Sequence, residues 1–218
     1  MVVFICVLVL WIFSLCLHEY AHARVAFAGG DYTVEDKGYL EFNPLRYTDP
    51  ILSIVFPVLC IVLGGFGLPG GCVWINTGLL RSRGWATAVS LAGPASNLAL
   101  VLVLSILFRL GLIPDNSESS LSATMAFFAF LQITAIVFNL LPVPGLDGFG
   151  AIAPWLPLEI QEGARRLYGI APMILILCMW QIKAAYAPFQ FACALLLQLF
   201  GIDFDLVISG AEQFKFWQ

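Results

Sequence analysis

The sequence predicts an all-α, polytopic membrane protein with about five to six membrane segments and a short extended or re-entrant segment within the membrane. Of its 218 residues, 61% are hydrophobic and only 11% are charged, whereas a soluble domain carries about 25% charged residues. Several uncharged apolar stretches are long enough to cross a bilayer, and a glycine-rich break interrupts one of them. We therefore expect the lipid bilayer to be the partner of most of the surface, and no charge pattern indicates nucleic acid.

The first predicted helix runs from Val2 to about Ala28 and carries a polar motif in its last third. Val2–Leu17 contains no charge, and His18, Glu19 and His22 follow it. Residues four apart share one face of a helix, so both imidazoles can reach one metal ion. The intervening glutamate can then act as a base toward a metal-bound water. A chance match that merely closes a membrane helix is the alternative, but ionisable groups are costly in a membrane and usually functional there.

The next part of the chain is predicted to be a surface loop and then a segment that enters the membrane and returns. Residues 29–50 are polar, with a short strand around residues 39–42. Ile51–Leu63 has helical character, the glycines and proline of Gly64–Gly71 break it, and Cys72–Asn76 is typical of a short strand. Irregular backbone at membrane depth must be buried in protein or line a wet cavity.

Two further membrane helices are predicted at Gly84–Phe108 and Leu121–Leu141. The first contains Gly93, which allows close helix approach, and Asn97, which we interpret as a hydrogen bonder between helices. A surface loop is expected around residues 159–166, where charged residues gather.

We expect one domain over residues 1–218. Its parts are a core of residues 1–150, a C-terminal hairpin of short membrane segments at about 167–202, and an amphipathic interfacial tail at 203–218. The six cysteines lie mostly inside apolar runs without a CxxC pair, so they are interpreted as packed hydrophobes. No basic residue precedes the first apolar run, so a cleaved signal peptide is not expected.

The distribution of basic residues predicts the orientation in the membrane. Three predicted loops hold most of them: Arg24, Lys37, Arg46, Arg81, Arg83, Arg165 and Arg166. The positive-inside rule places these loops in the cytoplasm and the N-terminus outside. That topology requires residues 51–76 to return to the side from which they enter. Asp147 then lies on the same side as the two histidines, toward the cytoplasmic side of the cell membrane.

A catalytic zinc site needs three protein ligands and one open position, so the histidine pair lacks one ligand. The acidic residues near predicted helix ends on the correct side are Asp147, Glu159 and Asp203. Asp147 follows a turn with two prolines and is the best placed. An ordinary Asp-Gly turn explains it equally well, so the residues alone leave the third ligand open.

Two separated motifs resemble the site-2 protease family of intramembrane zinc metalloproteases. They are His18-Glu19-Tyr20-Ala21-His22 and Asn139-Leu140-Leu141-Pro142-Val143-Pro144-Gly145-Leu146-Asp147-Gly148. Residues 38–50, 64–76 and 91–97 are also similar to segments of compact bacterial members. The resemblance covers about residues 5 to 150, and two motifs in the right order are far more specific than one metal-binding pair.

The resemblance implies hydrolysis of peptide bonds in or near the transmembrane segments of substrate proteins. It implies one Zn²⁺ per chain, bound by His18, His22 and Asp147. Glu19 would deprotonate the attacking water and later protonate the leaving amine. Asn139 would orient the substrate or stabilise the oxyanion, and its alternative role is a hydrogen bond between helices.

The chain departs from the family pattern at three places. Many members have a second glycine and an arginine directly after Gly148, where this chain has Phe149 and Gly150, and Tyr39 and Tyr47 replace a common arginine and histidine. None of these positions is a metal ligand, so the departures concern substrate handling. We expect a minimal catalytic core without a PDZ or CBS module.

Three alternatives compete with a site-2 protease. An inactive relative would act as a membrane scaffold, but it would not need an intact set of ligands and base. A metal transporter would use the histidines in transit, yet no inverted repeat is visible. A different membrane metalloprotease would take a glutamate, such as Glu159, as the third ligand.

Overall fold

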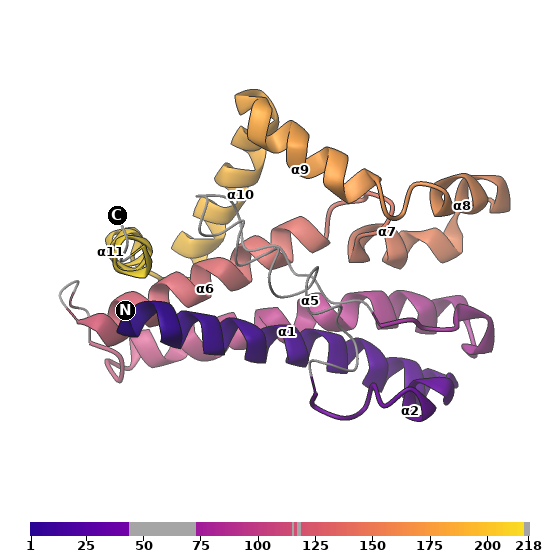
Figure 1. Cartoon of the computed structure of the whole chain (residues 1–218), viewed down its shortest axis with the longest axis horizontal. Coiled ribbons are helices and arrows are strands. Elements are labelled where there is room, and N and C mark those ends of the chain that lie inside the picture. The colour runs from indigo at the N-terminus through magenta and orange to yellow at the C-terminus, as the bar shows by residue number, and fades with distance from the viewer. Residues whose placement is uncertain (44–72, 115, 117–118, 216–218) are drawn as a thin grey trace.

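The computed structural model describes residues 1–43, 73–114, 116 and 119–215, and these residues form helices without a strand (Figure 1). The helices are α1 (Val2–Gly29), α2 (Thr33–Asp36), η2 (Thr77–Leu79), α5 (Arg83–Arg109), α6 (Ser120–Asn139), α7 (Asp147–Ile152), η3 (Ala153–Trp155), α8 (Leu158–Arg165), α9 (Ala171–Gln181), α10 (Lys183–Phe200) and α11 (Phe204–Phe214). The predicted all-α class is therefore confirmed for the described part of the chain.

Three helices, α1, α5 and α6, are long and apolar enough to cross a membrane. The pair α9 and α10 makes a fourth candidate only if it counts as one broken span, because its two halves bend by 91°. The described residues thus hold three to four candidate spans, and the expected five to six are not reached. The predicted re-entrant stretch at 51–71 lies outside the described residues.

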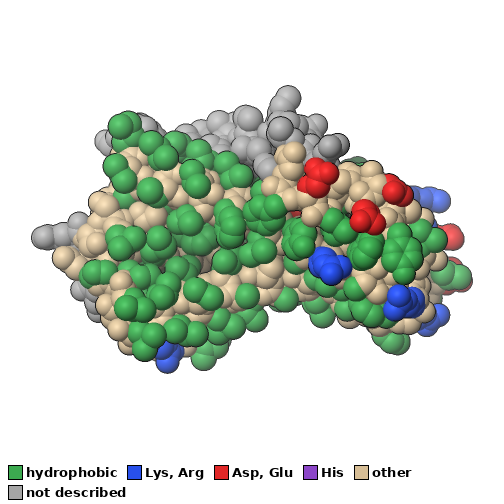
Figure 2. All heavy atoms as spheres, turned by 90° about the horizontal axis from the view of Figure 1, so that it is seen from below, with side chains coloured by type: hydrophobic (Ala, Val, Ile, Leu, Met, Phe, Trp, Pro, Cys, Tyr) green, Lys and Arg blue, Asp and Glu red, His purple; other side chains and the backbone are tan. Residues whose placement is uncertain are grey.

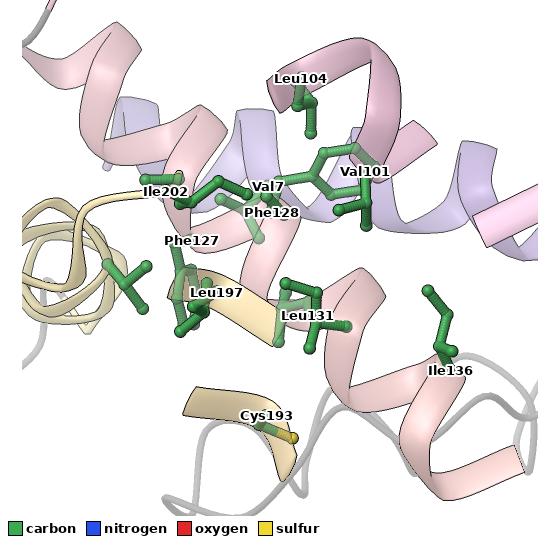
Figure 3. Packing of buried hydrophobic residues seen from close by; sticks show 14 of the residues in the cluster. Val7, Val101, Leu104, Phe127, Phe128, Leu131, Ile136, Cys193, Leu197 and Ile202 are labelled. Carbon is green, nitrogen blue, oxygen red and sulfur yellow. The ribbon is translucent and has the colours of Figure 1, made fainter. Parts of the chain in front are cut away.

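The three long helices pack against one another, and α5 runs opposite to α1 and α6 (Figure 1). Buried side chains of these helices and of α10 interlock, among them Val7, Val101, Phe128 and Leu197 (Figure 3). A polar link also joins α6 to α1, since the buried Gln132 amide donates to the Ser14 hydroxyl over 3.0 Å. A buried amide needs such a partner, so this bond favours one register between the two helices.

One end of the bundle is charged and the rest of its visible surface is mainly apolar (Figure 2). Most charged side chains on this face lie at the end that holds α2 and the start of α5. An apolar belt bounded by charge is what a lipid bilayer requires of a spanning protein. The chain is an integral membrane protein by this composition and by its candidate spans.

Local sequence signals set the ends of the long helices. Gly30 ends α1 in the left-handed region at φ 114°, a conformation that glycine adopts without strain. The Ser82 hydroxyl accepts from the Trp85 N–H at the start of α5, and the Ser119 hydroxyl accepts from the Ser122 N–H at the start of α6. The end of α1 and the start of α5 lie at the same end of the bundle (Figure 1).

Several local predictions are wrong in the structure. Residues 39–42 form turns, because the Tyr39 N–H donates to the Val34 carbonyl instead of joining a strand. Residues 73–76, the described part of the other predicted strand, pair with no strand within the described ranges. The predicted loop at 159–166 is the short helix α8, which Pro157 precedes.

The C-terminal tail contains α11, which packs on α6 through buried Leu206, Val207 and Phe214. Its expected position at the membrane interface stays a prediction. A side-chain carbon at Gly210 would clash with the Ala123 carbonyl, so the absence of a side chain lets the two helices approach. The predicted hairpin of two membrane segments is the bent pair α9 and α10.

Candidate metal centre

The two histidines of α1 present the same ring nitrogen to one another. His18 and His22 are 4% and 6% exposed, and their Nε2 atoms lie 3.1 Å apart. Each Nδ1 faces an acceptor on α5: Asn97 Oδ1 at 3.1 Å and the Val89 carbonyl at 2.6 Å. An oxygen acceptor holds the proton on Nδ1 and leaves the Nε2 lone pair free, which is the tautomer of a metal-ligating histidine.

Asp147 completes the cluster from a different part of the chain. Its Oδ2 lies 3.3 Å from His18 Nε2, and its Oδ1 lies 3.4 Å from His22 Nε2. Ligand atoms about 2 Å from a tetrahedral zinc are about 3.3 Å from each other. The spacing of the three side chains therefore fits one zinc ion, and they form the group that can hold a metal within the described part of the chain.

The backbone of α5 leaves space for an ion beside the imidazoles. A side-chain carbon built on Gly93 would clash with the Nε2 atoms of both His18 and His22. No other side chain can occupy that position while the imidazoles stay where they are. Gly93 was interpreted as a helix-packing residue, and the structure shows that it also faces the candidate metal centre.

The turn between α6 and α7 aims the Asp147 carboxylate. Gly145 has a φ of 96°, and a side-chain carbon on Gly148 would clash with the Leu140 carbonyl at the end of α6. The tight turn therefore requires both glycines. Burial alone would raise the pKa of the Asp147 carboxyl, but His18 and His22 imidazoles that carry a proton on Nε2 outweigh it and hold that pKa well below its ordinary value. A metal ion would take the place of those protons.

Glu19 lies beside the cluster and is itself buried, at 3% exposed. Its Oε2 accepts a hydrogen bond from the Val73 N–H at 3.1 Å. Ordinary sequence patterns give no signal for this contact, since residues 19 and 73 are far apart in the chain. The backbone thus fixes one oxygen of the carboxylate, and no residue of the described ranges is shown to bind the other.

Asn139 is the last residue of α6 and is 6% exposed. Its Nδ2 atom has no hydrogen-bond partner among the described residues. A buried amide group without a partner is costly, and it is suited to donate to a bound molecule. Its predicted role toward the substrate stays a prediction.

The two alternative ligands are not part of the cluster. Glu159 is exposed on α8, and Asp203 caps α11 by accepting from the Asp205 and Leu206 N–H groups. The structure thus brings Asp147, and neither of these carboxylates, to the histidine pair. The contacts that sequence reasoning missed are those of Val89, Gly93 and Val73, and Asn97 was noticed only as a possible link between helices.

The comparisons agree with the chemistry of these side chains. The chain is 41% identical to a protein of Mycolicibacterium smegmatis named "Putative zinc metalloprotease Rip2", over 99% of this chain and 82% of that protein. It is 40% identical over the same shares to the protein of that name in Mycobacterium tuberculosis strain H37Rv. A Bacillus subtilis protein named "Putative zinc metalloprotease YwhC" is 32% identical over 69% of this chain and 68% of its own length.

No family model and no solved structure matches the chain. The relatives nevertheless align with nearly the whole chain, and their names state the activity that a buried pair of histidines with an adjacent glutamate supports. The donor set of His18, His22 and Asp147 fits the zinc that those names imply. This chain belongs to the site-2 protease family of zinc metalloproteases.

Proposed function

We propose that the protein is an intramembrane protease that holds one zinc ion and cleaves peptide bonds in or near transmembrane segments of other membrane proteins. The observation that carries this proposal is the depth of the candidate metal centre. His18 lies about 24 Å along α1 from Val2 at the rise of an α-helix. The hydrocarbon layer is about 30 Å thick, so a centre at this point of a spanning helix lies within the membrane.

The residues of the centre suit hydrolysis of an amide. Bound zinc would supply Lewis acidity toward the scissile carbonyl and would activate a water molecule. His18, His22 and Asp147 hold the ion, and Glu19 accepts a proton from the attacking water and returns it to the leaving amine. The Asn139 amide, with its unpartnered Nδ2, donates to the oxygen that gains charge.

A helical substrate must unwind before it can be cleaved, because its backbone groups are all hydrogen-bonded. Residues 73–76 begin beside Glu19, and Asn76 at their end has extended backbone. The unwound substrate pairs with this backbone as an added strand. Proline at alternate positions of Cys72–Asn76 is expected to abolish cleavage while zinc stays bound, and unchanged cleavage would refute the pairing.

We also infer that the centre opens toward the cytoplasm and that the N-terminus lies outside. The basic residues nearest the centre's end of the bundle support this orientation: Arg24, Lys37, Arg81, Arg83, Arg165 and Arg166. The positive-inside rule assigns such an end to the cytoplasm. Water and the unwound peptide would then enter from that side.

The proposed function is tested by comparing the wild-type protein with Glu19→Gln in detergent. Both proteins are incubated with a membrane-segment reporter, and their zinc content is determined. We expect about one zinc in each and cleavage by the wild type alone, because glutamine keeps the shape but cannot accept the proton. Equal cleavage by both proteins, or zinc in both with no cleavage of any membrane-segment reporter, would contradict the proposal, and the second result would favour a membrane scaffold.

A further inference from the structure

Residues 73–76 form hydrogen bonds with two carboxylates in and just after α1. Neither carboxylate is a ligand of the candidate metal centre. The Val73 N–H donates to Glu19 Oε2 over 3.1 Å, and the Asn76 N–H donates to Asp31 Oδ2 over 2.7 Å. We call residues 73–76 the strap. The strap thus begins at the candidate catalytic base and ends at a carboxylate just beyond the helix.

Asp31 is a carboxylate with no exposed surface, at 0%. Its two oxygens have separate partners. Oδ1 accepts from the Thr33 N–H at 3.1 Å and from the Thr33 hydroxyl at 2.6 Å, and Oδ2 accepts from the Asn76 N–H. A buried carboxylate is costly unless it is fully hydrogen-bonded. One oxygen therefore shapes the turn into α2, and the other holds the strap.

Neighbouring contacts keep the chain on the same course. The Lys37 ammonium donates to the Trp74 carbonyl at 2.8 Å, and the Arg81 N–H donates to the Gly29 carbonyl at 2.9 Å. The Trp74 carbonyl and the Asn76 N–H thus face Lys37 and Asp31, while the Val73 N–H faces Glu19.

We infer that Asp31 is a positioning residue for Glu19, acting through the strap. Its Oδ2 fixes the strap at Asn76, and this register sets the Val73 N–H against Glu19 Oε2. The carboxylate of Glu19 is then held by one oxygen, and the other exchanges the proton in the proposed reaction. The catalytic part of this inference rests on the proposed function, whereas the placement of the strap does not.

A positioning role accounts for the burial of the Asp31 carboxylate just after the membrane helix α1. Asp31 makes no ion pair within the described ranges, and it lies beyond the metal ligands in the chain. Catalytic groups lose about a hundredfold in rate when they are misplaced by about 1 Å. A hydrogen bond to a charged acceptor is strong enough to prevent such a shift.

The test uses the full-length, zinc-loaded protein with Asp31→Asn and Asp31→Ala. Asparagine keeps the volume of the side chain but has one acceptor oxygen, so it cannot serve both Thr33 and Asn76. Thr33→Val is the matched control, because it removes one hydrogen bond to the same carboxylate and leaves Asn76 bound. Hydrogen exchange of the peptide 73–81, zinc affinity, kcat and KM are measured on each protein.

We expect the strap amides to exchange about tenfold faster or more in Asp31→Ala, less so in Asp31→Asn, and near the wild-type rate in Thr33→Val. Zinc affinity stays unchanged, and kcat falls about tenfold to a hundredfold in Asp31→Ala with a smaller change in KM. A purely structural role would not separate kcat from zinc affinity in this way.

Two results would overturn the inference. Unchanged exchange of the strap in Asp31→Ala would show that Asp31 does not hold it, and this result does not depend on any proteolysis. Faster exchange with wild-type kcat would show that the strap does not position Glu19. If the wild-type protein cleaves no reporter, the proposed function fails, while the exchange measurement still decides the placement of the strap.

Discussion

At the scale of single residues, the hydrogen-bond acceptors at the two Nδ1 atoms decide which nitrogen of each imidazole can bind a metal. Asn97 and the Val89 carbonyl each face an Nδ1 atom, so both Nε2 atoms point toward Asp147. Hydrogen bonds behind a ligand orient it and raise its affinity for metal. The histidines, the glutamate and the aspartate were predicted from the sequence, because their spacing and motif context carry a signal. The partners on α5 were not predicted as such, because a contact between distant residues leaves no local pattern.

Asn97→Ala is expected to weaken zinc binding by about tenfold to a hundredfold, since the His18 ring loses the acceptor that fixes its tautomer. Competition with a zinc chelator measures the affinity. Leu98→Ala is the control, because Leu98 is exposed on the outer face of the same helix. Equal affinities for both variants would show that Asn97 does not orient His18.

Gly93→Ala is expected to abolish zinc binding, because the added carbon would occupy the space between the two Nε2 atoms. The control is Gly84→Ala on the same helix, where an added carbon meets only the Ser82 hydroxyl at 3.6 Å. Zinc content of the two purified proteins measures the difference. A full complement of zinc in Gly93→Ala would mean that the ion does not bind beside α5.

Secondary-structure elements were predictable where they were long. The helices α1, α5 and α6 carry uninterrupted apolar runs, and their predicted ends agree with the structure to within about two residues. The short helix α8 and the turns at 39–42 were mispredicted, because a few residues give little periodic signal and tertiary contacts decide their conformation. The short helix α7 matters most, since it begins at Asp147 and packs against α5.

Thr87 fastens α7 and the following η3 to α5. Its hydroxyl donates to the Ala151 carbonyl at 2.7 Å and accepts from Trp155 Nε1 at 2.9 Å. Thr87→Val removes both hydrogen bonds at nearly constant volume, so we expect zinc affinity to fall about fivefold to thirtyfold as Asp147 loses support. Trp155→Phe removes only the second, exposed bond and should have a smaller effect. An effect of Trp155→Phe as large as that of Thr87→Val would contradict this account.

The whole molecule joins two distant motifs at one end of a helical bundle. Because α1 and α6 run in the same direction and α5 returns between their ends, the last third of α1 meets the turn after α6 (Figure 1). The sequence predicted this meeting from the charge of the loops, since it placed Asp147 on the side of the histidines. The described residues hold three to four candidate spans, because hydropathy alone does not separate α9 and α10, which bend by 91°, from two full crossings.

The measurement that tests the central claim most directly is the zinc content and X-ray absorption spectrum of the wild type, Asp147→Asn and Glu159→Gln. We expect about one zinc per wild-type chain, with imidazole nitrogen and carboxylate oxygen ligands at about 2.0–2.2 Å. Asp147→Asn should lose most of the zinc, and Glu159→Gln should match the wild type. Undiminished zinc with an unchanged spectrum in Asp147→Asn would show that the metal centre is not formed by His18, His22 and Asp147.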